Sequence, residues 1–435
     1  MFVKTTLNLL NEIFIRKRFF QTNIFSGTTS NREIRDALRA VFSKRLTIGP
    51  EIDVYERKFA EYLGVRKCFS FSTGRMALYA ILKVLNIGPG DEVIIPAFTC
   101  VVVPNAIIYA GAKPIYCDIE SERFGPEPKD LEAKISPRTR AVIAQHTFGV
   151  PCLIDEIIEI GKKYGIPVIE DCAHALGGKE KGRPVGTLGY ASFFSTDHTK
   201  VISTGIGGLA VSNDAALTQK LEIIYNESKF LSSWQIRRQI LTYAIFHCLT
   251  HPRVYWLSKS FLSLLVKTKI AMFITDYLKL TKPTAYPFPA RLSNVHSQIG
   301  ISQLDSLTEN LADRKRIANE FENITEVNEK LFKNEELDCV WLRYPILVEN
   351  RDDFIRDLEK YYDFGIWFTT VAGCRSSNFA DIGYTVGSCP NAERITKQIV
   401  SIPTHSRVKP KHILLNALQR LNKTSRGTYI YERSR

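Results

Sequence analysis

Short apolar runs alternate with longer mixed stretches from about Gly64 to Asn213. The runs are rich in Val and Ile, which is typical of buried strands, and each intervening stretch is long enough for a helix. Strands that alternate with helices predict crossover connections, and therefore a mostly parallel sheet with helices on both faces. Ligands of such sheets bind at the carboxyl ends of the strands. We expect four of the strands at EVIIP (Glu92–Pro96), KPIYCDI (Lys113–Ile119), RAVIAQH (Arg140–His146) and IPVIED (Ile166–Asp171).

Apolar residues at helical spacing predict helices on both sides of this α/β region. Before it, Asn31–Ser43 and the run VYERKFAEYLG are typical of amphipathic helices, and Gly64 ends the second. After it, one long helix is indicated by Ile299, Ile301, Leu304, Leu307, Leu311, Ile317 and Phe321. A small C-terminal α+β domain is predicted by a strand at Val340–Glu349, a helix over Asp352–Ile366 and a helix-to-strand passage over Glu393–Pro403.

The segment Lys229–Lys282 interrupts this order with two helical runs, Ile240–Leu249 and Trp256–Leu280, that are apolar on one side and basic on the other. Neither run has the roughly 20 uncharged apolar residues that a membrane span needs. We therefore predict a basic amphipathic helical insertion. Two interpretations stay open: contact with a membrane surface, or packing on the protein or on a second subunit. The segment Lys229–Lys282 contains one acidic residue, Asp276, and nine basic residues: Lys229, Arg237, Arg238, Arg253, Lys259, Lys267, Lys269, Lys279 and Lys282.

Composition and charge narrow the class of protein. With 45% hydrophobic and 24% charged residues, the chain is expected to be globular, neither disordered nor multispanning. The insertion alone carries 9 − 1 = +8 of the net charge of +13, and the near-balanced remainder has no nucleic-acid-binding signature. Nine scattered cysteines without a CxxC pair predict reduced core thiols in a cytosolic protein, with no disulfide framework and no metal site.

The length of 435 residues favours more than one domain. The patterns divide the chain into an N-terminal extension (1–30), a large domain (31–228), the basic insertion (229–290) and a small C-terminal domain (291–435). The first 20 residues space charges among apolar side chains, so we expect neither a secretion signal nor a spanning helix there.

Three stretches hold residues that are suited to chemistry. FSTGRMALYAIL, with Gly74 and Arg75, passes through hydroxyl groups and a glycine into a helix, and such a helix start binds anions. Asp171 ends a strand predicted to be buried, so it needs a cationic or hydrogen-bonding partner, and His174 follows. Lys200 lies in ASFFSTDHTKVISTGIGG, where hydroxyl groups and glycines suit a Schiff-base lysine. Singly, each is compatible with a helix cap, a core histidine or a surface lysine, but their order and spacing match a pyridoxal phosphate (PLP) site.

At this point the chain resembles the DegT/DnrJ/EryC1/StrS aminotransferases, which make amino sugars from nucleotide-linked keto sugars. The resemblance runs from about Leu46 to Ser406, with the basic segment as an insertion. It rests on eight motifs in the family's order: TIGPEIDVYERKFAEYLG, FSTGRMALYAIL, GPGDEVIIPAFTCVVVPNAIIYAGAKPIYCDI, HTFGVPCLIDEI, IEDCAHALGG, ASFFSTDHTKVISTGIGG, RLSNVHSQIGISQL and CPNAERITKQIVSIPTH. It implies the PLP-dependent transferase fold of type I, an α/β fold, with residues 31–228 as the PLP-binding domain, and a homodimer.

The resemblance also implies roles for individual residues. Lys200 stands where the family binds the cofactor covalently, and Asp171 where it pairs with the ring nitrogen. His174 stands beside the ring, and Ser195 and the helix start at Gly74–Arg75 match phosphate ligands. Two positions depart from the family. Cys100 stands where relatives often stack an aromatic side chain on the ring, and Pro289 stands where they lend an Asn to the phosphate of a neighbouring subunit.

The expected function is therefore PLP-dependent transfer of an amino group, with glutamate as donor, to a nucleotide-linked keto sugar in polysaccharide or glycoconjugate biosynthesis. We expect a cytoplasmic enzyme, peripheral at the inner membrane face if the insertion contacts lipid. Lys200 disfavours the family's dehydratases, which carry His at that position. Two alternatives remain: a non-catalytic PLP-binding regulator or assembly protein, and another PLP enzyme such as a desulfurase, for which Cys374 is the candidate nucleophile.

Overall fold

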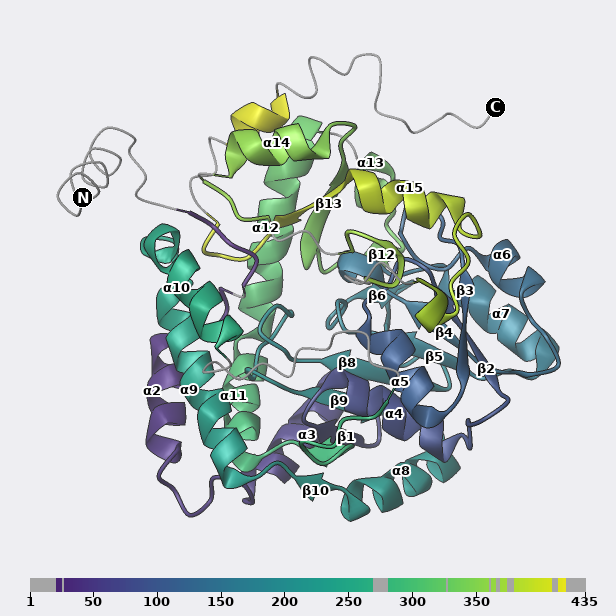
Figure 1. Ribbon diagram of the computed structural model, residues 1–435, viewed down its shortest axis with the longest axis horizontal. Helices are drawn as coiled ribbons and strands as arrows, with labels where there is room; N and C mark the ends of the chain where they lie inside the picture. Colours follow the sequence, from purple (N-terminus) through teal and green to yellow (C-terminus); the bar gives the residue numbers. More distant parts are fainter. Residues whose placement is uncertain are drawn as a thin grey trace.

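A computed structural model describes residues 21–25, 27–268, 281–325, 328–359, 361–364, 368–373, 379–408 and 414–419. A nine-stranded sheet lies at its centre, in the order β10-β11-β1-β9-β8-β5-β4-β2-β3 (Figure 1). The strands are β1 (Cys68–Phe71), β2 (Glu92–Pro96), β3 (Lys113–Cys117), β4 (Thr139–Gln145), β5 (Val168–Asp171), β8 (Ala191–Ser195), β9 (Gly208–Val211), β10 (Lys229–Phe230) and β11 (Ala290–Arg291). From β3 to β8 all neighbours are parallel, and β9 is antiparallel to both β8 and β1. The predicted α/β fold class is confirmed, and the four predicted strands form β2 to β5.

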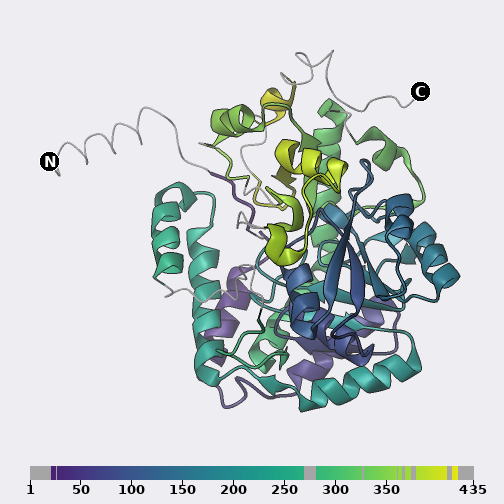
Figure 2. The ribbon, with the colours of Figure 1, turned by 45° about the vertical axis from the view of Figure 1, so that its right-hand side comes forward.

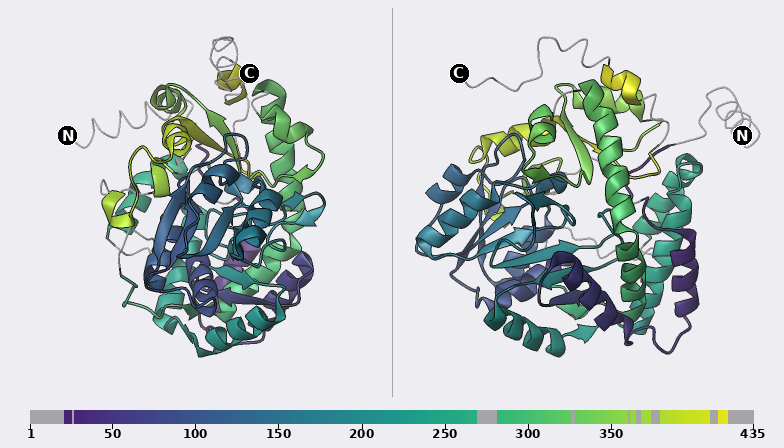
Figure 3. Two further views of the ribbon diagram at one scale, coloured as in Figure 1. Left: turned by 90° about the vertical axis from the view of Figure 1, so that its right-hand side faces the viewer. Right: turned by 180° about the vertical axis from the view of Figure 1, so that it is seen from behind.

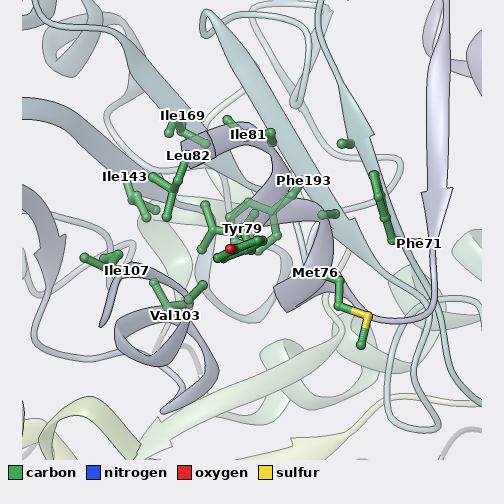
Figure 4. Close-up of a cluster of buried hydrophobic side chains, with 14 of the residues drawn as sticks. Phe71, Met76, Tyr79, Ile81, Leu82, Val103, Ile107, Ile143, Ile169 and Phe193 are labelled. Carbon is green, nitrogen blue, oxygen red and sulfur yellow. The ribbon is translucent and has the colours of Figure 1, made fainter. Parts of the chain in front are cut away.

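Helices cover both faces of this sheet. Alternate residues of a strand point to opposite faces, so Phe193 packs on the side of α4 (Gly74–Val84) while Phe194 contacts Phe59 of α3 (Glu51–Leu63), with ring centroids 5.1 Å apart. Figure 4 shows the first of these two clusters, in which Ile81 and Leu82 of α4 lie against the strands. The helices that precede the insertion are α2 (Asn31–Ala40), α3 (Glu51–Leu63), α4 (Gly74–Val84), α5 (Val102–Ala110), α6 (Pro128–Ala133), α7 (Ile154–Tyr164) and α8 (Ala215–Glu227).

The predicted insertion leaves the sheet at β10 and returns at β11, which are parallel neighbours at its edge. Between them, α9 (Ser233–Leu249) lies next to α2, and α10 (Tyr255–Lys267) packs against α9 (Figures 2 and 3). Both predicted helical runs are found here, although the part of the second run at 269–280 lies outside the described residues. Among the helices that the structure describes, none combines the length and the apolar character needed to cross a membrane.

The predicted long helix after Arg291 is two helices, α11 (Asn294–Asp305) and α12 (Leu307–Thr325). The single-helix prediction is wrong because Ser306 ends the first of them. Its hydroxyl donates to the carbonyl oxygens of Ser302 and Gln303, each at 3.3 Å. The two helices also pack differently, since α11 lies against α3 and α2 and α12 packs mainly with the C-terminal strands.

The C-terminal residues build the predicted mixture of helices and strands around the antiparallel pair β13–β14. The helix predicted over Asp352–Ile366 is shorter than expected and ends at Leu358, because Tyr362 instead forms a β-bridge with Thr22. The remaining elements are α13 (Glu329–Lys333), β13 (Arg343–Leu347), α14 (Arg351–Leu358), α15 (Pro390–Gln398), β14 (Ile399–Pro403) and the small sheet of β6 (Lys179–Glu180), β7 (Arg183–Pro184) and β12 (Leu337–Asp338). The predicted domain boundaries remain predictions.

Candidate active site

The start of α4 lies directly against the ends of two central strands. A Cβ atom on Gly208 of β9 would lie 2.2 Å from the Gly74 backbone nitrogen, so only glycine fits there. A Cβ atom on Gly74 would in turn lie 3.1 Å from Ser195 Cβ, at the end of β8. Thr73 caps the helix by accepting the Met76 N–H at 3.2 Å. The predicted phosphate ligands Gly74 and Ser195 are thus neighbours at a helix N-terminus, where N–H groups are available to an anion.

Arg75 is held in an aromatic cage next to this helix start. Its side chain is only 2% exposed, and Nη2 donates to the Tyr286 hydroxyl at 3.2 Å. The guanidinium also lies 5.2 Å from the Phe288 ring and 5.6 Å from the Tyr109 ring. Burial lowers the pKa of Arg75. The segment just before Pro289 therefore contacts Arg75 of its own chain.

Asp171 is the last residue of β5, between β4 and β8, at the carboxyl edge of the parallel strands. Its carboxylate accepts the Ala173 N–H at 3.0 Å. Burial raises the pKa of Asp171 to about 6, and the Ala173 N–H, Lys200 and His146 oppose this rise. The carboxylate is therefore mostly ionised at pH 7, although water does not solvate it.

Lys200 lies in the loop between β8 and β9 and is 8% exposed. Burial lowers its pKa, while negative charge on Cys100, Asp197 or Asp171 would raise it. The Cys100 thiol has a pKa raised by burial, an effect that Lys200 opposes. A Cβ atom on Gly373 would lie 3.4 Å from Cys100 Cα, so the 3₁₀ turn Val371–Gly373 packs on the residues around Cys100. The structure thus brings Lys200, Asp171 and Cys100 within electrostatic range of one another.

His174 follows β5 and joins the same group. Its Nδ1 accepts the Phe148 N–H at 3.3 Å, and the two rings are stacked at 12° with centroids 6.2 Å apart. Burial lowers the pKa of His174 well below its usual range, and Lys200 and Arg343 lower it further. The imidazole is therefore neutral, and because Nδ1 is an acceptor, its hydrogen is on Nε2.

Behind Asp171, the carboxylate of Glu170 fixes a backbone turn. It accepts the N–H groups of Gly186 at 2.7 Å, Leu188 at 2.8 Å and Gly189 at 2.6 Å, and its Oε2 lies 3.0 Å from His146 Nε2. With Cys172, Glu170 and His146 form a group of three potential metal donors within 4.8 Å in the described part of the chain. Because the carboxylate already accepts these bonds, we interpret the group as support for the end of β5.

Sequence reasoning missed Phe148, Arg343 and the residues that hold the Lys200 loop. Phe148 lies in the HTFGV motif. Its backbone has a φ of 55°, which is uncommon for a residue other than glycine and cannot be read from the sequence. Cys374, the candidate nucleophile of a desulfurase, lies outside the described residues.

Comparison with known proteins shows which family this chain belongs to. The model of the DegT/DnrJ/EryC1/StrS aminotransferase family matches residues 28–243 and 274–418. The chain belongs to this family. The aminotransferase class and the PLP cofactor that the motifs predict are thereby confirmed. Residues 244–273, between the two matched stretches, contain the end of α9 and all of α10.

The chain is also similar to individual proteins and solved structures. An uncharacterised protein of Methanocaldococcus jannaschii is 27% identical, over 91% of this chain and 96% of its own length. A GDP-perosamine synthase of Caulobacter vibrioides is 30% identical over 63% of this chain, and the match spans 62% of that enzyme. Among solved structures, NtdA of Bacillus subtilis with bound cofactor PMP has a TM-score of 0.68 at 21% identity, covering 91% of this chain and 83% of that one.

Proposed function

We propose that this protein transfers an amino group from an amino acid, with glutamate as the first candidate, to a keto sugar carried on a nucleotide. The observation that supports this most directly is a buried lysine, Lys200, with a lowered pKa, within electrostatic range of Asp171. Only a neutral amine can act as a base, and a lowered pKa increases its neutral fraction near pH 7. Family membership supplies the reaction class, and similarity to a GDP-perosamine synthase suggests the type of acceptor.

Each residue of the candidate site would have a separate role toward PLP and the amino donor. PLP, when bound, supplies the ring that accepts electrons during amino-group exchange. The first turn of α4 and the Ser195 hydroxyl would bind its phosphate through N–H and O–H donors. Asp171, ionised above about pH 6, would hold a proton on the ring nitrogen, and neutral His174 would donate a hydrogen bond to the cofactor. Lys200 would hold the cofactor until the amino donor displaces it, and the freed Nζ would then take the proton from the Cα atom of the donor and deliver it to the cofactor.

The test is a Lys200→Ala variant. We expect it to lose the visible absorbance of the bound cofactor and to lose turnover, while its circular dichroism remains that of the wild type. Lys58→Ala, which removes an exposed lysine of α3 that pairs with Asp305, is the matched control and keeps both properties. Transamination by Lys200→Ala at the wild-type rate would overturn the assignment.

The substrates are identified by incubating purified protein with glutamate and a panel of nucleotide-linked 3-keto and 4-keto sugars, with the products read by mass. The same preparation separates the alternative functions. A non-catalytic regulator binds PLP but shows no spectral half-reaction with any amino donor. A desulfurase releases sulfide from cysteine.

We further propose a cytoplasmic homodimer that contacts an anionic membrane surface through α10. Leu257, Phe261 and Leu264 lie about one turn apart on this helix and are 53%, 51% and 54% exposed. Its other side is buried against α9. The exposed side chains of Arg253 and Lys267 lie on the same helical region and would complement anionic headgroups.

Vesicle co-sedimentation tests the membrane proposal with a triple variant, Leu257→Ser, Phe261→Ser and Leu264→Ser. We expect at least about tenfold weaker binding to anionic vesicles, since each large apolar side chain contributes about 1.5–3 kcal/mol on burial. Ile223→Ser on α8, which removes another exposed side chain (58%), leaves binding unchanged. The membrane proposal is wrong if the wild type does not bind vesicles and the triple variant is monomeric in light scattering. A second subunit would then cover this face of α10.

A further inference from the structure

The loop that carries Lys200 is closed at its base by two threonines. The Thr204 N–H donates to the Thr196 carbonyl at 2.9 Å, and the two hydroxyl groups lie 2.7 Å apart. The Thr196 N–H donates to the carbonyl of Gly207, also at 2.9 Å. These bonds fix both ends of the loop, but Val201 and Ser203, which follow Lys200, depend on other parts of the chain.

Three side chains from three different helices hold these two residues. Asn310 of α12 donates to the Val201 carbonyl at 2.6 Å. Gln303 of α11 accepts the Ser203 N–H at 3.0 Å. Tyr243 of α9 donates its hydroxyl hydrogen to the Ser203 carbonyl at 3.1 Å. The loop is therefore positioned from outside the sheet, and α9 is one of its three supports.

Tyr243 also contacts the loop through its ring. A Cβ atom on Gly205, which has a φ of 83°, would lie 3.2 Å from this ring, so ring and loop backbone are in close contact. On the other side of Lys200, the His198 ring lies 5.5 Å from Tyr243 and 5.9 Å from Phe246. Helix α9 thus touches the loop both before and after Lys200.

The hydroxyl of Tyr243 donates one hydrogen bond and accepts another. Because its one hydrogen goes to Ser203, its oxygen accepts the Thr29 hydroxyl, 2.8 Å away. Tyr243 and Ser203 are 3% and 1% exposed, so water does not replace a lost bond easily. Helix α9 continues beyond Tyr243 into residues 244–273, which the family model does not match.

We propose that Tyr243 is a positioning residue for Lys200: its hydroxyl fixes the Ser203 carbonyl, and through the short loop it fixes the direction of the lysine amine. This inference rests on the proposed role of Lys200. Tyr243 is the last residue that the family model matches before 244–273, so α9 connects the Lys200 loop to this unmatched segment.

The test compares Tyr243→Phe with Tyr255→Phe. Tyr255 lies on α10 of the same insertion, is also buried, and donates its hydroxyl hydrogen to Asp363 at 2.6 Å, away from the loop. Hydrogen–deuterium exchange of the purified protein is the first measurement. In Tyr243→Phe we expect the amides of residues 201–206 to exchange about five to ten times faster, the scale of one lost hydrogen bond. In Tyr255→Phe their exchange is unchanged.

Steady-state kinetics give the second measurement. We expect kcat of Tyr243→Phe to fall about tenfold while KM for the amino donor stays within about twofold, because the lysine and not the donor site is displaced. The pH at which the absorbance of the bound cofactor changes should also shift, since that pH reports on the environment of Lys200. Tyr255→Phe should alter neither.

Thr29→Val adds a graded variant, because it removes only the bond that Tyr243 accepts. Its exchange rates at 201–206 should lie between those of the wild type and Tyr243→Phe. The inference is wrong if Tyr243→Phe and Tyr255→Phe have equal exchange at 201–206 and equal kcat. A wild type without transaminase activity would refute the proposed function and would leave the exchange comparison intact.

Discussion

Gly208 offers the sharpest test of the proposed phosphate site, because its replacement by alanine puts one methyl group into the start of α4. The new Cβ atom would lie 2.2 Å from Gly74 N and 2.4 Å from Gly74 Cα, more than about 1 Å inside normal van der Waals contact. Backbone atoms must then move, and a displacement of about 1 Å can weaken a precisely built site about 100-fold. We therefore expect Gly208→Ala to raise the Kd for PLP by about 10–100-fold and to lower stability by about 1–3 kcal/mol.

Two further glycines make the experiment a graded series. A Cβ atom on Gly74 would lie 3.0 Å from the Phe194 carbonyl, a tight but smaller contact, so Gly74→Ala should have a weaker effect. A Cβ atom on Gly88 would meet only the Ala110 carbonyl at 3.8 Å, so Gly88→Ala serves as the control. PLP titration of the cofactor-free variants, followed by absorbance, gives the Kd values, and urea unfolding gives the stabilities. The reasoning fails if Gly208→Ala binds PLP within twofold of Gly88→Ala.

Two more predictions follow from the buried ionisable groups. His174 should stay neutral from pH 8 to pH 5, because burial lowers its pKa well below the usual range; ¹⁵N NMR of the labelled apoprotein should find Nδ1 unprotonated throughout, and a titration in this range would contradict the structure. The pKa of Asp171 is about 6 in the folded protein and about 3.9 in the unfolded chain, so burial of its charge removes stability as the pH rises from 4 through 6. Asp171→Asn should therefore gain about 2–3 kcal/mol relative to the wild type over that interval, measured by urea unfolding of the apoprotein at each pH, and a pH-independent difference would refute this.

The strands were the most predictable part of the fold. A parallel strand that is buried on both faces needs a continuous apolar run, and β2 to β5 therefore appear within a few residues of their predicted places. The helix boundaries were less predictable. Apolar spacing continues across Ser306, but α11 ends there as it packs on α3, where Gly300 lies against the Tyr55 ring. The end of α14 depends on Thr22, far away in the sequence.

The site shows the same division between local and distant information. Lys200, Asp171 and His174 lie in local motifs, and their residue types and spacing suggest a cofactor without any knowledge of the fold. Gln303 and Tyr243 act through a backbone group of Ser203, and any polar residue of suitable length could serve. No pattern in a single sequence distinguishes them from other buried polar side chains. Their roles depend on which helix the fold places beside the loop.

The insertion appears in the sequence as an appendage, but in the structure it contacts the two elements that we propose to hold the cofactor. At the C-terminal end of the insertion, the Ser72 N–H donates to the Ala290 carbonyl at 2.8 Å, and Tyr286 contacts Arg75. Both contacts lie beside the start of α4. Where the chain leaves, Tyr243 holds the Lys200 loop. Deletion of 229–290 would therefore remove support from both elements together with the exposed face of α10. Loss of vesicle binding in such a deletion would not identify the lipid-facing residues, whereas substitutions confined to the outer side of α10 leave both supports in place.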